Sequence, residues 1–93
     1  MKLPVNYNDT HFTKRRPVRE EYVKRQGGRC YHCNTSLDGE PSKKVKTLPI
    51  DKDLFPSTMF NWPVHLHHNR NTGMTIGAVH AVCNAVLWQY YGE

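Results

Sequence analysis

The first third of the chain holds one segment with a helical pattern of hydrophobic positions. Residues 1–16 show no periodic pattern, so we expect a basic N-terminal arm with little structure of its own. In residues 17–26, Val18 and Tyr22 lie four positions apart, which places both on one face of a helix. Pro17 suits the first position of a helix, and two consecutive glycines follow the segment. The pattern therefore predicts a short helix over residues 17–26.

The middle of the chain lacks a regular pattern. Residues 34–61 contain three prolines and many Asn, Asp, Ser and Gly residues, a composition typical of loops. Residues 45–48 are compatible with a short strand, although no strong alternation supports one. We therefore expect this region to be mostly loop.

The last third alternates between hydrophobic and polar positions and then becomes more uniformly hydrophobic. The alternation in residues 62–68 is typical of a strand, and the turn residues 71–73 follow it. Residues 74–79 return as a second strand, in which Gly77 marks a bulge or a close approach of other atoms. Residues 81–91 favour a helix that ends at a glycine. The order strand, turn, strand, helix predicts an α+β fold.

The composition adds that this is a small domain with a limited core. The chain has 93 residues, of which 38% are hydrophobic, so it has room for one domain. Its three cysteines cannot all pair within the chain, so we expect a reducing compartment and a bound metal instead of disulfides. No hydrophobic run approaches the ~20 residues of a membrane span, and residues 1–12 do not resemble a signal peptide. We therefore expect a cytoplasmic protein with no membrane contact.

The excess of positive charge lies in one half of the chain. Residues 1–46 hold 11 Lys and Arg against 5 Asp and Glu, whereas residues 47–93 hold 2 against 3. The basic half is either a phosphate-binding surface or a solvated face, and charge alone does not decide between them. We expect Trp62, Trp88 and the tyrosines near the C-terminus to lie in the core or an interface rather than to stack on bases.

Four side chains have the spacing of a structural zinc site. Cys30 and Cys33 form a Cys-x2-Cys pair, and His80 and Cys83 form a His-x2-Cys pair. Three thiolates and one imidazole complete a tetrahedral zinc site, and all cysteines of the chain are used. Zinc binding would also add folding free energy to a small core. The alternative is that the cysteines are simply buried apolar residues and the histidine is unrelated.

A second cluster contains histidines and lies in the predicted hairpin. His67 and His68 are adjacent, and Arg70 follows them. His65 shares a strand face with His67, and we expect it to be solvated; the alternative is that it supports the site from behind the metal ligands. Asn84 directly follows the last cysteine and is rotated by about 100° from it on the predicted helix, toward the hairpin. Histidine clusters of this kind often bind metal ions.

Residues 66–84 (LHHNRNTGMTIGAVHAVCN) resemble the core of HNH (ββα-metal) endonucleases. The resemblance is to phage recombination endonuclease VII and the small free-standing HNH endonucleases of podophages. It includes the hairpin with its Thr-Gly turn, the second pair of zinc ligands and the Asn after the last cysteine, and it extends over residues 18–91. It implies a small ββα-metal fold stabilised by zinc, with an added N-terminal helix. Residues 17–93 would form the nuclease domain and residues 1–16 the arm.

The resemblance also assigns roles to individual residues. His68 matches the general base, and His67 and Asn84 match the ligands of a catalytic divalent metal, Mg²⁺ or Mn²⁺/Ni²⁺. Arg70 stands where many relatives have a second histidine, and Asn69 where they often have Asp. We expect Arg70 to contact a phosphate oxygen.

Together these features predict a metal-dependent DNA endonuclease that hydrolyses phosphodiester bonds and nicks one strand. The chain ends two residues after the predicted last helix, so we expect no C-terminal dimerisation region and a monomer, with a homodimer as the alternative. We expect it to be phage-encoded and to act in the bacterial host cytoplasm. The competing hypotheses are a non-catalytic zinc-containing module that binds DNA or protein, and a purely structural zinc protein.

Overall fold

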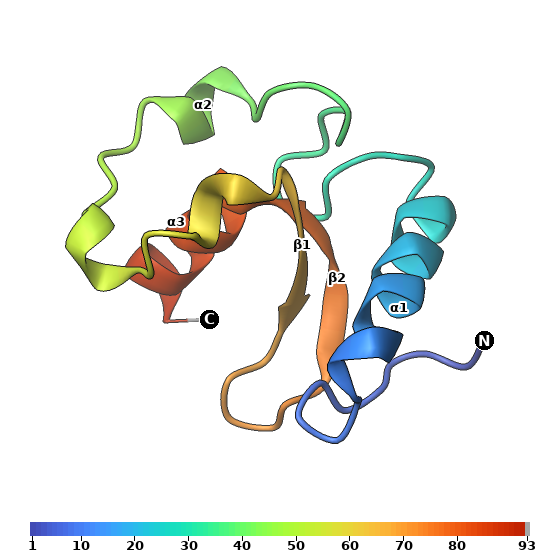
Figure 1. The fold of residues 1–93 in the computed structure, drawn as a ribbon. Coiled ribbons are helices and arrows are strands. Elements are labelled where there is room, and N and C mark those ends of the chain that lie inside the picture. Colours follow the sequence, from blue (N-terminus) through green and yellow to red (C-terminus); the bar gives the residue numbers. More distant parts are fainter. Residues whose placement is uncertain (93) are drawn as a thin grey trace.

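A computed structural model describes residues 1–92 and confirms an α+β fold. A two-stranded hairpin lies between two longer helices, α1 and α3 (Figure 1). The helices and strands are α1 (Phe12–Arg25), α2 (Lys43–Lys46), β1 (Val64–His68), β2 (Thr75–His80) and α3 (Ala81–Tyr91). Two 3-10 turns, Lys52–Leu54 and Met59–Asn61, lie in the connection between α2 and β1. Within residues 1–92, no helix is long and apolar enough to cross a membrane.

The antiparallel hairpin has the predicted strands and an irregularity near its turn. His67 pairs with Gly77, but His68 pairs with Thr75, so β2 has one extra residue at this point. The extra residue changes the strand geometry between the two adjacent histidines. The turn is held by Asn69, whose Oδ1 accepts hydrogen bonds from two backbone N–H groups of the turn at 2.8 and 3.0 Å. The predicted turn is confirmed, and Asn69 has a structural part in it.

The prediction that a helix starts at Pro17 is wrong. Helix α1 begins at Phe12, and the imidazole Nδ1 of His11 caps it by accepting from Thr13 N–H at 3.3 Å. Histidine is not one of the usual N-cap residues, so the true start was hard to recognise from the sequence. Pro17 lies inside the helix, where it removes one hydrogen bond of the helical ladder.

Residues 1–16 are not the unstructured arm that the sequence suggested. Asn6 forms a β-bridge with Met74, and the Val5 carbonyl accepts from Thr75 N–H at 2.9 Å. The N-terminal segment therefore lies along the outer side of β2 at the turn end of the hairpin. The expected boundary at residue 16 falls inside α1.

Of the other two α-helices, the sequence predicted α3 but not α2. The helix predicted over residues 81–91 is confirmed and ends at Gly92, whose φ of 70° is left-handed. Residues 45–48 form no strand, because Ser42 accepts from Val45 N–H and caps the short helix α2. Val45 is buried in the core beneath the loops.

The core joins every main element. Its buried members are Val18, Tyr22, Cys30, Leu37, Val45, Ala78, Val79, Cys83, Val86 and Leu87. A buried hydrogen bond of 2.8 Å between the Tyr22 hydroxyl and Thr75 Oγ1 ties α1 to β2. Because two cysteines belong to this core, the metal-ligating residues are part of the packing that holds the domain together.

The side chain of Gln26 takes the place of a neighbouring strand beside β2. Its Oε1 accepts from the Ala78 N–H at 2.8 Å, and its Nε2 donates to the Ala78 carbonyl at 2.9 Å. Gly77 allows this approach, since a Cβ there would lie 2.8 Å from Gln26 Oε1 and 3.0 Å from the Tyr31 side chain. The close approach that the sequence predicted at Gly77 is confirmed.

We predict that Gln26→Ala lowers the free energy of unfolding by about 1–3 kcal/mol, because it leaves the buried Ala78 N–H without its partner. Urea unfolding at a fixed zinc concentration measures the change. Lys24→Ala, at an exposed position of the same helix, is the control and should change stability much less. Equal stabilities of the two variants would contradict the role given to Gln26.

Candidate metal centre and histidine cluster

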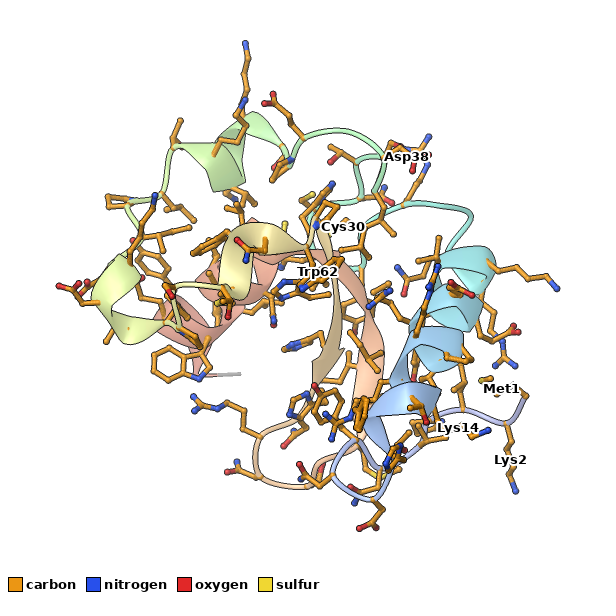
Figure 2. All side chains as sticks on the ribbon, viewed as in Figure 1. Met1, Lys2, Lys14, Cys30, Asp38 and Trp62 are labelled. Carbon is orange, nitrogen blue, oxygen red and sulfur yellow. The ribbon has the colours of Figure 1, made fainter. Side chains whose placement is uncertain are left out.

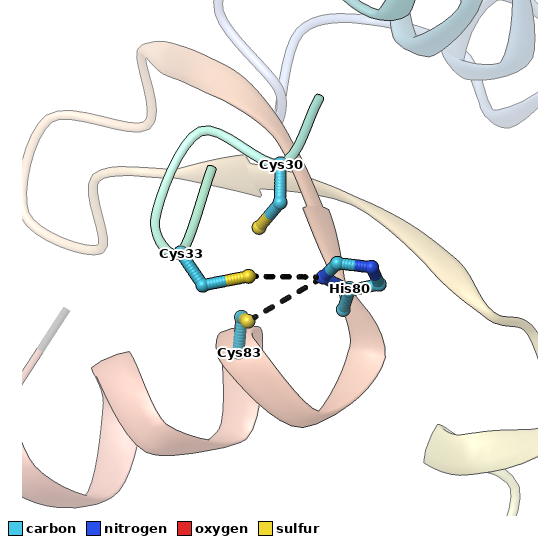
Figure 3. A group of neighbouring side chains, drawn as sticks. All are labelled: Cys30, Cys33, His80 and Cys83. Atoms are coloured by element: carbon cyan, nitrogen blue, oxygen red, sulfur yellow. Dashed lines mark hydrogen bonds between the residues drawn. The ribbon is translucent and has the colours of Figure 1, made fainter. Parts of the chain in front are cut away.

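The four predicted ligands converge at the junction of β2 and α3. Cys30 and Cys33 lie in the turn after α1, His80 ends β2, and Cys83 lies in the first turn of α3. Their donor atoms all lie within 4.8 Å of one another and point toward a common centre (Figure 3). The prediction that these four residues come together in one group that could hold a metal ion is confirmed.

His80 presents a defined nitrogen to the centre. Its Nδ1 lies 3.4 Å from Cys33 Sγ and 3.6 Å from Cys83 Sγ. Its Nε2 donates to the Ser36 carbonyl at 2.8 Å, so in the neutral imidazole Nδ1 carries no proton and can coordinate a metal. A carbonyl partner of this kind fixes both the tautomer and the orientation of a ligating imidazole.

Hydrogen bonds lower the pKa values of Cys30 and Cys33 and raise that of Cys83. A hydrogen bond between Cys83 and Cys30 lowers the pKa of Cys30 to about 4 and raises the pKa of Cys83. Burial opposes ionisation of Cys33, but hydrogen bonds with Thr35 outweigh it and hold the pKa of Cys33 below its ordinary value. A divalent cation would offset the repulsion among three thiolates.

The dimensions of the group suit zinc. Zn–S bonds of about 2.3 Å in a tetrahedron place neighbouring sulfur atoms about 3.8 Å apart. The donor atoms, all within 4.8 Å, are close to this geometry. Three thiolates with one imidazole are a common set of ligands in structural zinc sites. The Ser36 carbonyl, which accepts from His80 Nε2, is a common kind of hydrogen-bond partner for a ligating histidine.

The histidine cluster forms around Asn84. Asn84 Oδ1 lies 3.1 Å from His67 Nδ1, and Asn84 Nδ2 lies 3.1 Å from His65 Nδ1. The structure therefore brings together His67 and Asn84, which the resemblance paired as metal ligands. The expectation that His65 is solvated is wrong, because it is half-buried and burial lowers its pKa. Strand alternation had placed it on the same face as His67, and that signal could have identified it.

His68 has a neighbour that the sequence did not indicate. Its imidazole stacks on the Tyr7 ring, with centroids 3.9 Å apart and planes 5° from parallel. The Arg15 guanidinium also contacts Tyr7, 3.9 Å from the ring centroid. Burial lowers the pKa of His68, and the nearby charges of His67 and Arg15 act in the same direction. Tyr7 was missed because its segment was expected to be an unstructured arm.

The surface around the cluster has two separate hollows. An open cleft of about 250 Å³ is lined by His68 and Asn84 together with Arg15 and Arg19 of α1. His67 is 2% exposed and lines a second hollow on the side of α3 that carries Leu87 and Tyr91. The cleft thus connects His68 and Asn84 with the basic helix.

Arg70 lies apart from this cleft. Its guanidinium lies 4.3 Å from the centroid of the Trp88 ring, which holds it over α3. The side chain remains exposed. Its position on Trp88 gives Arg70 a packing partner that the sequence did not predict.

Comparison with known proteins found no family model, no curated protein and no solved structure that matches this chain. The resemblance to HNH endonucleases therefore rests on the residues that carry it. The chemistry of the site follows from the side chains and contacts described above.

We predict that the purified protein binds one zinc ion per chain through the four converging ligands. Cys83→Ser should lower the bound zinc to well below one equivalent, because it replaces a buried thiolate ligand. Metal analysis after gel filtration measures the stoichiometry. His32→Ala, which lies between Cys30 and Cys33 but outside the ligand group, is the control and should keep its zinc. Wild-type protein that contains no zinc, or a Cys83→Ser variant that keeps a full equivalent, would refute the site.

Proposed function

We propose that this protein is a zinc-containing, metal-dependent DNA endonuclease of the HNH type that nicks one strand. The observation that carries the proposal is the pairing of His67 with Asn84, since Asn84 and His68 line a cleft that reaches the basic helix α1. The hairpin and helix that carry these residues are joined at the Cys3His group. A zinc ion at that group would serve the fold, and the chemistry would take place at the histidines.

His68 is assigned the role of general base. Water attacks the phosphorus in line with the leaving 3′ oxygen, and the His68 imidazole accepts a proton from that water. The bond to the 3′ oxygen breaks, and that oxygen takes a proton from solvent water, which leaves a 3′-hydroxyl and a 5′-phosphate. The stacking of His68 on Tyr7 fixes the plane of the imidazole, so its proton-accepting nitrogen has a defined direction.

His67 and Asn84 are the residues that would hold the catalytic divalent metal. Two adjacent ligands at bond lengths near 2.1 Å lie about 3.0 Å apart, and His67 Nδ1 lies 3.1 Å from Asn84 Oδ1. When bound, the cation neutralises charge on the phosphoryl and leaving oxygens. An imidazole donor favours Mn²⁺ or Ni²⁺ in addition to Mg²⁺. His65 holds the Asn84 amide in place from its other end.

The basic residues of α1 supply the contacts with DNA. Arg15 and Arg19 line the cleft beside His68, where their guanidinium groups can donate hydrogen bonds to phosphate oxygens. Most of the positive charge of the chain lies in the same half of the sequence. Binding that rests on such contacts should weaken steeply with added salt.

The second candidate is a non-catalytic zinc-containing module that binds DNA or protein. One observation favours it: His67 is 2% exposed and lines a hollow separate from the cleft of His68. A metal held there would be less accessible to a phosphate in the cleft. This candidate keeps the zinc group and the basic surface but assigns no reaction to the histidines.

We predict that the protein converts supercoiled plasmid to the nicked form when Mg²⁺, Mn²⁺ or Ni²⁺ is added. His68→Ala should lower the nicking rate by about 10²-fold or more, because it removes the general base. Asn84→Ala should also lower the rate, and more metal should partly restore it. Agarose gel electrophoresis separates the plasmid forms and gives the rates.

His11→Ala is the matched control, because His11 caps α1 away from the cleft and should leave nicking nearly unchanged. Zinc content and circular dichroism check that each variant is folded. If the wild-type protein cuts no DNA with any of the three metals, the non-catalytic candidate is correct. If His68→Ala cuts as fast as wild type, the role of His68 is wrong.

A further inference from the structure

Trp62 is an exposed aromatic side chain in a basic setting. Its side chain, labelled in Figure 2, follows the second 3-10 turn and lies just before β1. It is 70% exposed, so of the expected positions, core or interface, the core is excluded. It lines the cleft that contains His68, and it also lines a neighbouring hollow with Arg16 and Arg19. Trp62 and Arg19 are thus shared by both hollows, and Trp62 stands where the basic helix meets the histidine cluster.

The two arginines come from one face of α1. Arg16 and Arg19 are three positions apart, so their side chains lie side by side on the helix surface. Arg16 pairs with Glu20 at 3.0 Å, but both side chains are largely exposed, and an exposed pair of this kind is weak enough for a phosphate to replace it. Within residues 1–92, none of the side chains that line the two hollows is acidic. The surroundings of Trp62 therefore favour an anion.

We propose that Trp62, Arg16 and Arg19 bind one unpaired nucleotide of a DNA strand beside the cleft of His68. The base stacks on the exposed indole, and the guanidinium groups contact the phosphates on either side of that nucleotide. The combination of an aromatic platform with flanking arginines is how proteins bind single strands. The proposal rests on the proposed function in taking DNA as the ligand, but it requires no cleavage.

The geometry selects an unpaired base rather than an intact duplex. Within a duplex both faces of a base are covered by its neighbours, so an indole can stack only on a base at an end, a gap or a single-stranded region. Trp62 would therefore direct the protein toward DNA with single-stranded character.

Tryptophan fluorescence tests the proposal directly, because the chain has only two tryptophans. Trp88→Phe leaves Trp62 as the single reporter and keeps an aromatic ring in contact with Phe55. The zinc-loaded variant is titrated, without added divalent metal, with single-stranded DNA of about 12 nucleotides. The matched duplex and an abasic strand of the same length are titrated in parallel.

The single strand should quench the Trp62 emission, whereas the abasic strand should bind about tenfold more weakly and leave the emission nearly unchanged. The duplex should quench less than the single strand. In the wild-type background, Trp62→Ala should weaken single-strand binding about tenfold by fluorescence anisotropy of labelled DNA. Phe12→Ala, which removes an equally exposed ring (71%) elsewhere on the surface, should have little effect. Arg19→Gln should weaken binding of the normal and abasic strands equally.

Equal quenching by duplex and single strand, absence of quenching, or an unchanged affinity of Trp62→Ala would each overturn the proposal. The outcome is separable from the endonuclease proposal, because the readout is binding without cleavage. A protein that nicks plasmid but shows no Trp62 quenching loses only this site. A protein that never nicks but shows quenching by the single strand loses only the catalytic function.

Discussion

The convergence of three thiols and the His80 imidazole is the constraint on which the rest of the structure depends. The group joins the turn after α1 to the junction where β2 ends and α3 begins, two segments that are distant in sequence. Because Cys83 is fixed at the start of α3, the next residue, Asn84, faces the hairpin and meets His67. A zinc ion at this group would add folding free energy to a small core, and the position of Asn84 beside the histidines follows from that of Cys83.

The parts of the fold that local chemistry determines could be predicted, and the parts that depend on distant contacts could not. The ligand spacing, the hairpin and the helix over residues 81–91 each have a local signal, and all are present. Tyr7 was missed because its position depends on backbone hydrogen bonding to the hairpin turn, more than sixty residues away in sequence. The exposure of Trp62 was not predicted because nothing in its sequence neighbourhood shows that its ring lies at the surface beside arginines from α1.

The two adjacent histidines of the cluster, His67 and His68, lie in different surroundings on either side of Asn84. His67 is buried at a hollow that Leu87 and Tyr91 of α3 also line. His68 instead lies in a cleft whose wall includes the N-terminal segment and α1. The first fifteen residues thus complete a surface whose centre lies in the last third of the chain. Tyr7 contributes its ring and Arg15 its charge, and Arg15 also donates to the Tyr7 carbonyl at 3.2 Å. Arg15 and Arg19 from the basic half of the sequence and His68 from the hairpin therefore line one cleft.

The Gln26 amide also limits β-pairing between separate copies of this protein. A two-stranded hairpin normally exposes unpaired N–H and C=O groups, and such an edge can recruit a strand from another molecule. On the outer side of β2, Gln26 occupies both groups of Ala78, and residues 5–7 occupy the stretch near the turn. The domain thus protects this edge with one side chain and a short piece of backbone, where a larger protein would use a third full strand. A single amide at the end of α1 thereby helps to keep the folded chain from intermolecular β-pairing and aggregation.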